Sequence, residues 1–326
     1  MLKSRSQAEI GAACVFVFVF CGAFRDVYLG GVFQAVSVFL VLLLAFGIAT
    51  VAGLSIAFRK GGTAMAPLRA APMDVLMMNL TTAGAWISYF FALKLLDPSI
   101  VNTLFAGIGP FVVIALGWTR FGIATRSRST ALQRALQLGV VGTLAVLVWI
   151  VATGRSGFQS ADNMAALGSA ALALLAGSLI TVSHLFAKRL DEGGATPSAI
   201  LGTRFFGLLV VASCGVVYEG PAITFDLSAV EVLRVAGAAF LLIVVPVWFN
   251  QIGMSKINPL NARVITAFGP VMVFALQQVD ARIAWSSETF AAIVTYSVLV
   301  VLANVSQGKE FRGARACPDA TPRTAG

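Results

Sequence analysis

The sequence predicts an all-α integral membrane protein with ten transmembrane helices, arranged as two inverted five-helix repeats. Three observations predict this fold. The chain of 326 residues is 58% hydrophobic and only 11% charged, which leaves too few polar residues to cover a soluble globule. Ten apolar stretches, each long enough to cross the hydrocarbon core, occupy nearly all of the chain. Two of them carry Gly-Pro pairs at matching places in the two halves, Gly109-Pro110 and Gly269-Pro270.

The predicted spans are continuously apolar rather than alternating with period two, which favours helices over a β-barrel. With alternating spans, sixteen of the 23 Lys and Arg residues lie on one side of the membrane and five, including Arg25, on the other. This asymmetry predicts cytoplasmic termini and an inner-membrane location. The same scatter of basic residues over short loops argues against a nucleic-acid partner, despite the net charge of +9. The spans lie near residues 9–28, 35–57, 74–95, 99–118, 133–153, 164–187, 198–218, 232–251, 260–278 and 288–306.

The third span carries a polar and aromatic stripe at helical spacing, formed by Asn79, Thr82, Trp86 and Tyr89. An apolar wall with a few placed polar groups is typical of a small-molecule pocket, so these side chains are candidate substrate contacts. The alternative is that Asn79 and Thr82 join helices through hydrogen bonds and that Tyr89 is an interfacial anchor.

The fourth span begins after Asp97-Pro98 and contains Pro110. A proline inside a helix removes one backbone hydrogen bond and kinks the helix, so a free carbonyl is expected near Pro110. Such a carbonyl must face protein or a water-filled cavity. The alternative is a kink that serves packing alone.

The turn residues from Gly154 to Ser160 follow the fifth span and mark the joint between a first repeat, residues 1–155, and a second, residues 156–308. His184 on the sixth span is a candidate proton relay, because imidazole changes charge near neutral pH, or else a structural donor. Arg204, which follows Pro197 in the seventh span, is a candidate substrate contact or a snorkelling residue.

The ninth span follows Asn258-Pro259 and carries Arg263, Thr266, Pro270 and Gln277 at spacings that place them on one helical face. A polar face in a lipid-buried helix is expected to point inward, so Arg263, Thr266 and Gln277 are candidate substrate contacts and Pro270 a second helix break. Arg263 can instead snorkel to the nearby membrane surface. After the tenth span, residues 309–326 are expected to form a disordered cytoplasmic tail.

The halves align with an offset of about 160 residues, and an odd number of helices per half inserts the second copy upside down. Two segments resemble the EamA branch of the drug/metabolite transporter superfamily. The first runs from Tyr89-Phe90-Phe91-Ala92-Leu93-Lys94 to Gly109-Pro110-Phe111-Val112-Val113-Ile114-Ala115-Leu116-Gly117-Trp118, and the second from Asn250 to Ala275. The resemblance implies a small-metabolite transporter, whose cavity is formed by spans three, four, eight and nine with one and six alongside.

The substrate charge is predicted from the buried charges. Asp26 and Asp74 are expected at helix ends, which leaves only cations inside the membrane and favours an anionic or amino-acid-like substrate. Besides this substrate and the lipid bilayer, protons are a candidate coupling ion and a homodimer a candidate assembly. No cofactor or metal is expected, and no set of residues for an enzyme mechanism is present. The alternative function is a non-transporting membrane scaffold or receptor-like protein.

Overall fold

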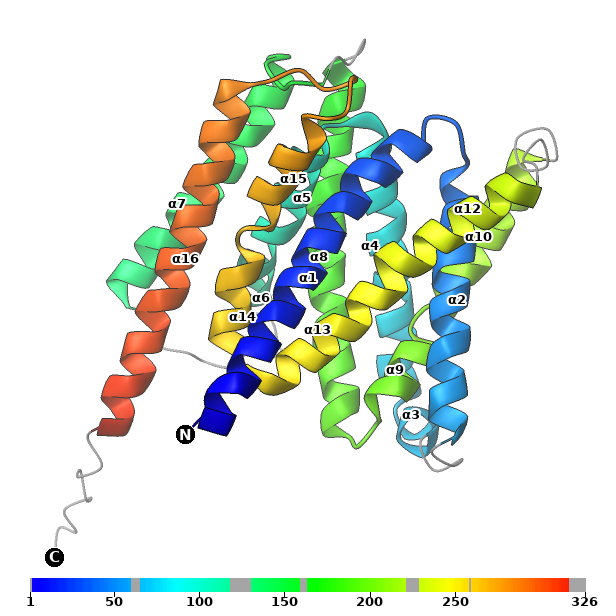
Figure 1. Cartoon of the computed structure of the whole chain (residues 1–326), viewed down its shortest axis with the longest axis horizontal. Coiled ribbons are helices and arrows are strands. Elements are labelled where there is room, and N and C mark those ends of the chain that lie inside the picture. Colours follow the sequence, from blue (N-terminus) through cyan, green and yellow to red (C-terminus); the bar gives the residue numbers. More distant parts are fainter. Residues whose placement is uncertain are drawn as a thin grey trace, which may run out of the picture.

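The computed structural model describes residues 2–59, 65–117, 130–158, 163–220, 229–257 and 259–316. Within these ranges the protein is almost entirely helical, at 86%, and has no strand, as the sequence predicts. Long helices run side by side through the whole bundle (Figure 1). Asn258, residues 159–160 of the predicted joint, the end of the fourth span at residue 118 and tail residues 317–326 lie outside the described ranges.

Among the described residues, eight helical stretches are long and apolar enough to cross a membrane, which supports a multi-pass membrane protein. All ten predicted spans are helical, although several are divided into two helices. The helices are α1 (Leu2–Val32), α2 (Val38–Arg59), α3 (Ala66–Ala70), α4 (Pro72–Leu95), α5 (Pro98–Gly107), α6 (Gly109–Gly117), α7 (Ala131–Ala152), α8 (Asn163–Glu192), α9 (Pro197–Thr203), α10 (Phe206–Glu219), α12 (Ala229–Ala239), α13 (Val245–Lys256), α14 (Pro259–Thr266), α15 (Gly269–Gln277) and α16 (Ser287–Ala316). The last helix thus continues beyond residue 308, where the tail was expected to begin.

The predicted eighth and ninth spans are not among the eight; within the eighth, a shorter apolar stretch covers Ala236–Asn250. Both spans are interrupted. A π-helical turn over Phe240–Val244 separates α12 from α13, just before Pro246. Proline has no N–H to continue the α-helical hydrogen bonds, which accounts for the change of helical register there. The ninth span is broken into α14 and α15 between Thr266 and Gly269.

Successive spans run in opposite directions, so that α1 starts and α16 ends at the same end of the bundle (Figure 1). Contacts between the halves follow a repeating pattern. The most extensive contacts between the halves are those of α4 with α8 and of α1 with α13. Further pairs are α2 with α9 and α10, α5 with α15, and α7 with α16.

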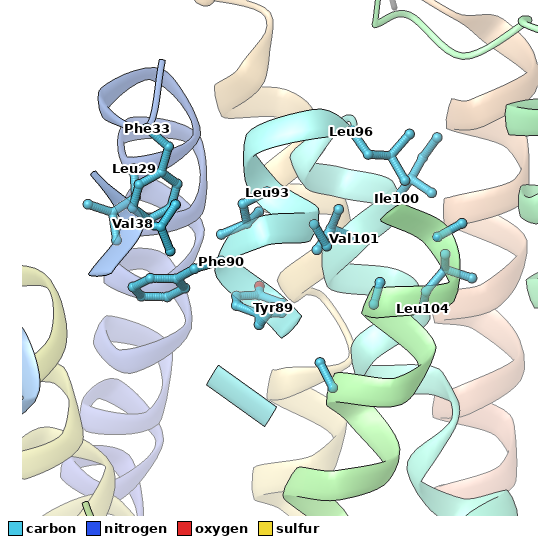
Figure 2. Packing of buried hydrophobic residues seen from close by; sticks show 14 of the residues in the cluster. Leu29, Phe33, Val38, Tyr89, Phe90, Leu93, Leu96, Ile100, Val101 and Leu104 are labelled. Atoms are coloured by element: carbon cyan, nitrogen blue, oxygen red, sulfur yellow. The ribbon is translucent and has the colours of Figure 1, made fainter. Parts of the chain in front are cut away.

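The main hydrophobic core lies where α1, α2, α4, α5 and α8 meet, and Figure 2 shows part of it around Phe33, Phe90, Leu93 and Leu104. All four side chains are fully buried. The close approach of α2 to α9 depends on two glycines, since a methyl group on Gly53 would lie 2.6 Å from the backbone nitrogen of Gly202. Small residues at crossings of this kind are common between membrane helices.

The connection between the halves is attached to the loop between α15 and α16. Phe158 forms an isolated antiparallel bridge with Ile283. The Ala284 N–H donates to the Gly157 carbonyl at 2.7 Å, and the Ser286 hydroxyl donates to the Arg155 carbonyl at 2.9 Å. These backbone contacts lie at the end of the bundle opposite the two termini (Figure 1).

Candidate functional site

A buried carboxylate on α1, Asp26, is the centre of a polar network between α1, α4 and α5. Its Oδ1 pairs with Arg25 Nη2 at 2.7 Å. Its Oδ2 accepts hydrogen bonds from the Tyr89 hydroxyl at 2.7 Å and from Asn102 Nδ2 at 2.8 Å. Asp26 is fully buried, so every contact that it makes is with the protein.

The position of Asp26 corrects the prediction from sequence. Both Asp26 and Arg25 were expected at the outer end of the first span, but α1 continues to Val32 and carries them within the bundle. The expectation that buried charges are exclusively positive is therefore wrong. The apolar residues from Val27 to Phe33 are the signal that the helix continues past Asp26. Asp74, in contrast, lies in the first turn of α4 and pairs with Arg189 at 3.3 Å.

Trp86 and Tyr89, both predicted site residues on α4, lie beside this network. The Arg25 guanidinium lies 5.5 Å from the centroid of the Trp86 ring. The ring of Tyr89 packs against Phe105 at 4.5 Å between centroids. Aromatic faces stabilise a guanidinium electrostatically, so Trp86 supports the Arg25 side chain as well as offering apolar area.

A second polar cluster lies nearer the start of α4, around Arg204, which lies at the junction of α9 and α10. Arg204 Nε donates to Thr82 Oγ1 at 3.2 Å and its Nη2 donates to Ser183 Oγ at 3.2 Å. The two hydroxyls are themselves 2.6 Å apart. No Asp or Glu within the described ranges lies within ion-pair distance of Arg204, which is half-buried.

Two other predicted residues near this cluster have different environments. Asn79 is buried, accepts from the Gly207 N–H at 3.0 Å and donates to the Val75 carbonyl at 2.9 Å. These bonds agree with the alternative that Asn79 joins helices. His184 follows Ser183 on α8 and is exposed.

The polar stripe predicted on the ninth span is divided by the break between α14 and α15. Arg263 and Thr266 are exposed on α14, whereas Pro270 and Gln277 are buried on α15. Thr266 donates to the Arg263 carbonyl at 3.0 Å, within its own helix. Arg263 and Gln277 thus lie on separate helices, one exposed and the other buried.

Gln277 instead closes the end of the bundle opposite the termini. Its Nε2 donates to Asp97 Oδ2 at 3.1 Å, and its Oε1 accepts from the Ser99 N–H at 3.1 Å. Asp97 caps the start of α5, and burial raises the pKa of its carboxyl above the ordinary value of 3.8. Nearby, Arg282 Nη1 donates to the Gly30 carbonyl at 2.8 Å. Both contacts join the first half of the chain to the second.

The two Gly-Pro interruptions adjoin different helices, the first α8 and the second α1. In the fourth span, α5 ends at Gly107 and α6 begins at Gly109, and a methyl group on Gly109 would lie 3.0 Å from the Thr181 hydroxyl of α8. Pro110 is exposed. In the ninth span, a methyl group on Gly269 would lie 3.6 Å from Val19 of α1 and 3.7 Å from Asn102 Oδ1. The second break therefore adjoins the Asp26 network.

Sequence reasoning missed Arg25, Asp26, Asn102 and Ser183 as members of these clusters. Asn102 is the one amide in the apolar run from Ile100 to Leu104, and that isolation is a signal that could have found it. Shallow hollows lie elsewhere, one of about 480 Å³ with an apolar lining on α2 and one of about 460 Å³ between α7 and α16. The second is lined partly by the exposed ion pair of Arg155 with Glu288, and neither hollow contains a residue of the two clusters. Within the described residues, no group of three His, Cys, Asp or Glu side chains could hold a metal ion.

Comparisons with known proteins bear on the fold alone. No protein-family model and no curated protein matches the sequence. A solved structure described as "Crystal structure of protein" is similar, with a TM-score of 0.59 and 19% sequence identity, over 95% of this chain and 99% of that one. At this level of identity the likeness indicates a shared helical arrangement over the whole chain.

Proposed function

We propose that the protein is a secondary transporter of the EamA type, which moves a small metabolite across the inner membrane by alternating access. Its repeats would be residues 1–155 and 156–308, with cytoplasmic termini. The pattern of neighbours supports this proposal, because α1, α4, α5 and α6 would correspond to α8, α13, α14 and α15. Exchanging these equivalents converts the α4–α8 contact into the α13–α1 contact, and the α5–α8 contact into the α14–α1 contact. Such exchange is expected of two copies related by a two-fold axis in the membrane plane.

One observation carries the proposal: each half contains a span broken at a Gly-Pro pair, and the two broken spans pack together through α5 and α15. Proline donates no hydrogen bond, so the carbonyls of Ala106 and Thr266 each lose their usual helical partner. Ala106 and Thr266 are both exposed. Irregular backbone within a membrane requires protein or water as a partner, which favours a solute passage beside these breaks.

The polar clusters give the passage its chemistry. Trp86 and Tyr89 offer aromatic area, and Arg204 offers a cation, beside the hydrogen-bonding groups of Thr82 and Asn102. These groups suit a small anionic or amino-acid-like metabolite, with protons as a candidate coupling ion. Because the buried Asp26 belongs to the same interior, the preference for an anion cannot rest on an absence of carboxylates. It rests on the cation that Arg204 offers.

Alternating access requires the contacts between the halves at the end opposite the termini to break in one of the two states. Asp97 belongs to the first half and Gln277 to the second, and their hydrogen bond is one such contact. A reversible cross-link there should stop transport. The test uses the full chain in proteoliposomes, with its four native cysteines replaced and a cysteine pair at Asp97 and Gln277. The control pair is Lys188 and Glu192, which lie one turn apart in α8.

Counterflow of radiolabelled anionic metabolites is the measurement. We expect at least one metabolite to exchange above the level of protein-free liposomes, and the Asp97–Gln277 cross-link to abolish this exchange until it is reduced. The Lys188–Glu192 cross-link should leave exchange unchanged. Absence of counterflow for every metabolite would contradict a transporter and favour a scaffold, and full exchange with the Asp97–Gln277 cross-link in place would contradict opening at this end.

A further inference from the structure

We propose that Arg204, together with the hydroxyls of Thr82 and Ser183, forms a subsite for the carboxylate of a monoanionic solute with an apolar body. This inference rests on the proposed transport function and narrows its substrate class. It narrows the expectation drawn from sequence, an anionic or amino-acid-like substrate, to an acid without an ammonium group.

Charge balance distinguishes Arg204 from Arg25. Arg25 is neutralised by Asp26 at 2.7 Å. Arg204 contacts two neutral hydroxyls and, within the described residues, no carboxylate. An arginine inside a membrane protein is costly and normally faces a partner charge or a water-filled path. Within the part of the chain that the structure describes, Arg204 thus carries a positive charge that no carboxylate compensates.

The depth of the guanidinium argues against snorkelling. Thr82, which accepts from Arg204, lies ten residues into α4 from Pro72, or about 15 Å along the helix. Ser183, the second acceptor, lies nine residues before the end of α8 at Glu192, or about 14 Å along it. The nearest charged pair on these two helices, Asp74 with Arg189, lies eight residues before Thr82 and six after Ser183, or about 12 Å and 9 Å along the helices. The guanidinium is therefore held inside the bundle and does not reach toward the surface.

The hydrogen-bonding capacity of the cluster fits a carboxylate. A guanidinium has five N–H donors and binds carboxylates in a two-pronged geometry. Nε and Nη2 of Arg204 are each bound to a hydroxyl, and Nη1 has no bonded partner within the described ranges. The hydroxyls of Thr82 and Ser183 can also rotate to donate to a bound oxygen. One uncompensated cation matches one negative charge, which favours a carboxylate over a phosphate dianion.

The surroundings of the cluster define the rest of the solute. Trp86 is one helical turn from Thr82 on the same face of α4 and packs against Phe46 at 4.8 Å between ring centroids. Phe46 also contacts Phe205, the neighbour of Arg204, at 4.8 Å. The fully buried Asp26 is occupied by three protein donors and has no exposed oxygen for an ammonium group. The solute is thus an acid whose apolar or aromatic body points toward Trp86.

The test measures binding to the full chain in lipid nanodiscs, independently of transport. The probes are three carboxylates, each with its neutral amide: benzoate and benzamide, phenylacetate and phenylacetamide, 3-phenylpropionate and 3-phenylpropanamide. We expect the wild type to prefer the carboxylate in at least one pair. Arg204→Gln should weaken binding of that carboxylate about 10- to 100-fold, the range expected for hydrogen bonds to a charged group, and leave amide binding unchanged. Arg69→Gln is the matched control, since Arg69 is an exposed arginine on α3.

A second variant keeps the test decisive if Arg204→Gln fails to fold. Ser183→Asp places a carboxylate beside Arg204 within the protein, so it should raise the melting temperature while it abolishes carboxylate binding. Lack of any carboxylate preference in the wild type, or undiminished binding by folded Arg204→Gln or Ser183→Asp, would overturn the subsite. Carboxylate binding that depends on Arg204, without counterflow in proteoliposomes, would support the subsite and contradict the transport function.

Discussion

Replacement of Tyr89 by phenylalanine isolates one hydrogen bond of the Asp26 network. The Tyr89 hydroxyl donates to Asp26 Oδ2 at 2.7 Å, and both side chains are buried. Tyr89→Phe keeps the ring and its contact with Phe105, so the change removes little beyond this bond. Hydrogen bonds to charged groups contribute about 1.5–3 kcal/mol. Asp26 retains Arg25 and Asn102, so we expect the free energy of unfolding to fall by about 1.5–3 kcal/mol and the fold to persist.

The size of this loss tests the reasoning, because hydrogen bonds between helices in a membrane protein average only about 0.6 kcal/mol. A loss well above that average is expected only if the acceptor is a buried carboxylate. The free energy of unfolding is measured by denaturation in mixed micelles. Tyr28→Phe on α1 is the control, since Tyr28 is exposed. A loss of about 0.5 kcal/mol or less for Tyr89→Phe, or an equal loss for Tyr28→Phe, would refute the proposed role of the bond.

Two further changes test other parts of the fold. Gly53→Ala places a methyl group 2.6 Å from the Gly202 nitrogen and should reduce stability by about 1–3 kcal/mol, whereas Gly22→Ala, with nothing within 4 Å, should not. Equal unfolding curves for the two variants would contradict the close contact between α2 and α9. The hydrogen bonds from Arg282 lower the pKa of Asp280 below its ordinary value of 3.8. A lowered pKa stabilises the folded state above that value and less as pH falls through the lowered pKa. The melting temperature of wild type should therefore exceed that of Asp280→Asn at pH 7 and approach it under acid conditions, and a constant difference between them would contradict this.

Hydrophobic pattern was sufficient to predict the helices and their approximate limits, because an apolar run in a bilayer has few structural alternatives. It was insufficient for the polar interior. The pattern does not indicate how far α1 extends past Asp26, and that extension decides whether Arg25 and Asp26 lie in a loop or in the bundle. Helical spacing groups Trp86 with Tyr89, whose rings are neighbours in the structure. It also groups Arg263 with Gln277, of which one is exposed on α14 and the other buried on α15. Spacing assumes one continuous helix, and the break before Gly269 makes that assumption invalid.

The bridge between Phe158 and Ile283 constrains how the protein can change shape. It joins the connection between the halves to the loop between α15 and α16, at the end of the bundle remote from both chain ends. The halves are thus joined there both by the backbone and by this bridge. A joint secured twice acts as a pivot, and displacement about a pivot grows with distance from it. The greatest excursions are thus expected near Gln7 and Lys256, where the hydrogen bond from Lys256 to Gln7 would have to break. Probes attached to these two helices should report that separation with the largest signal.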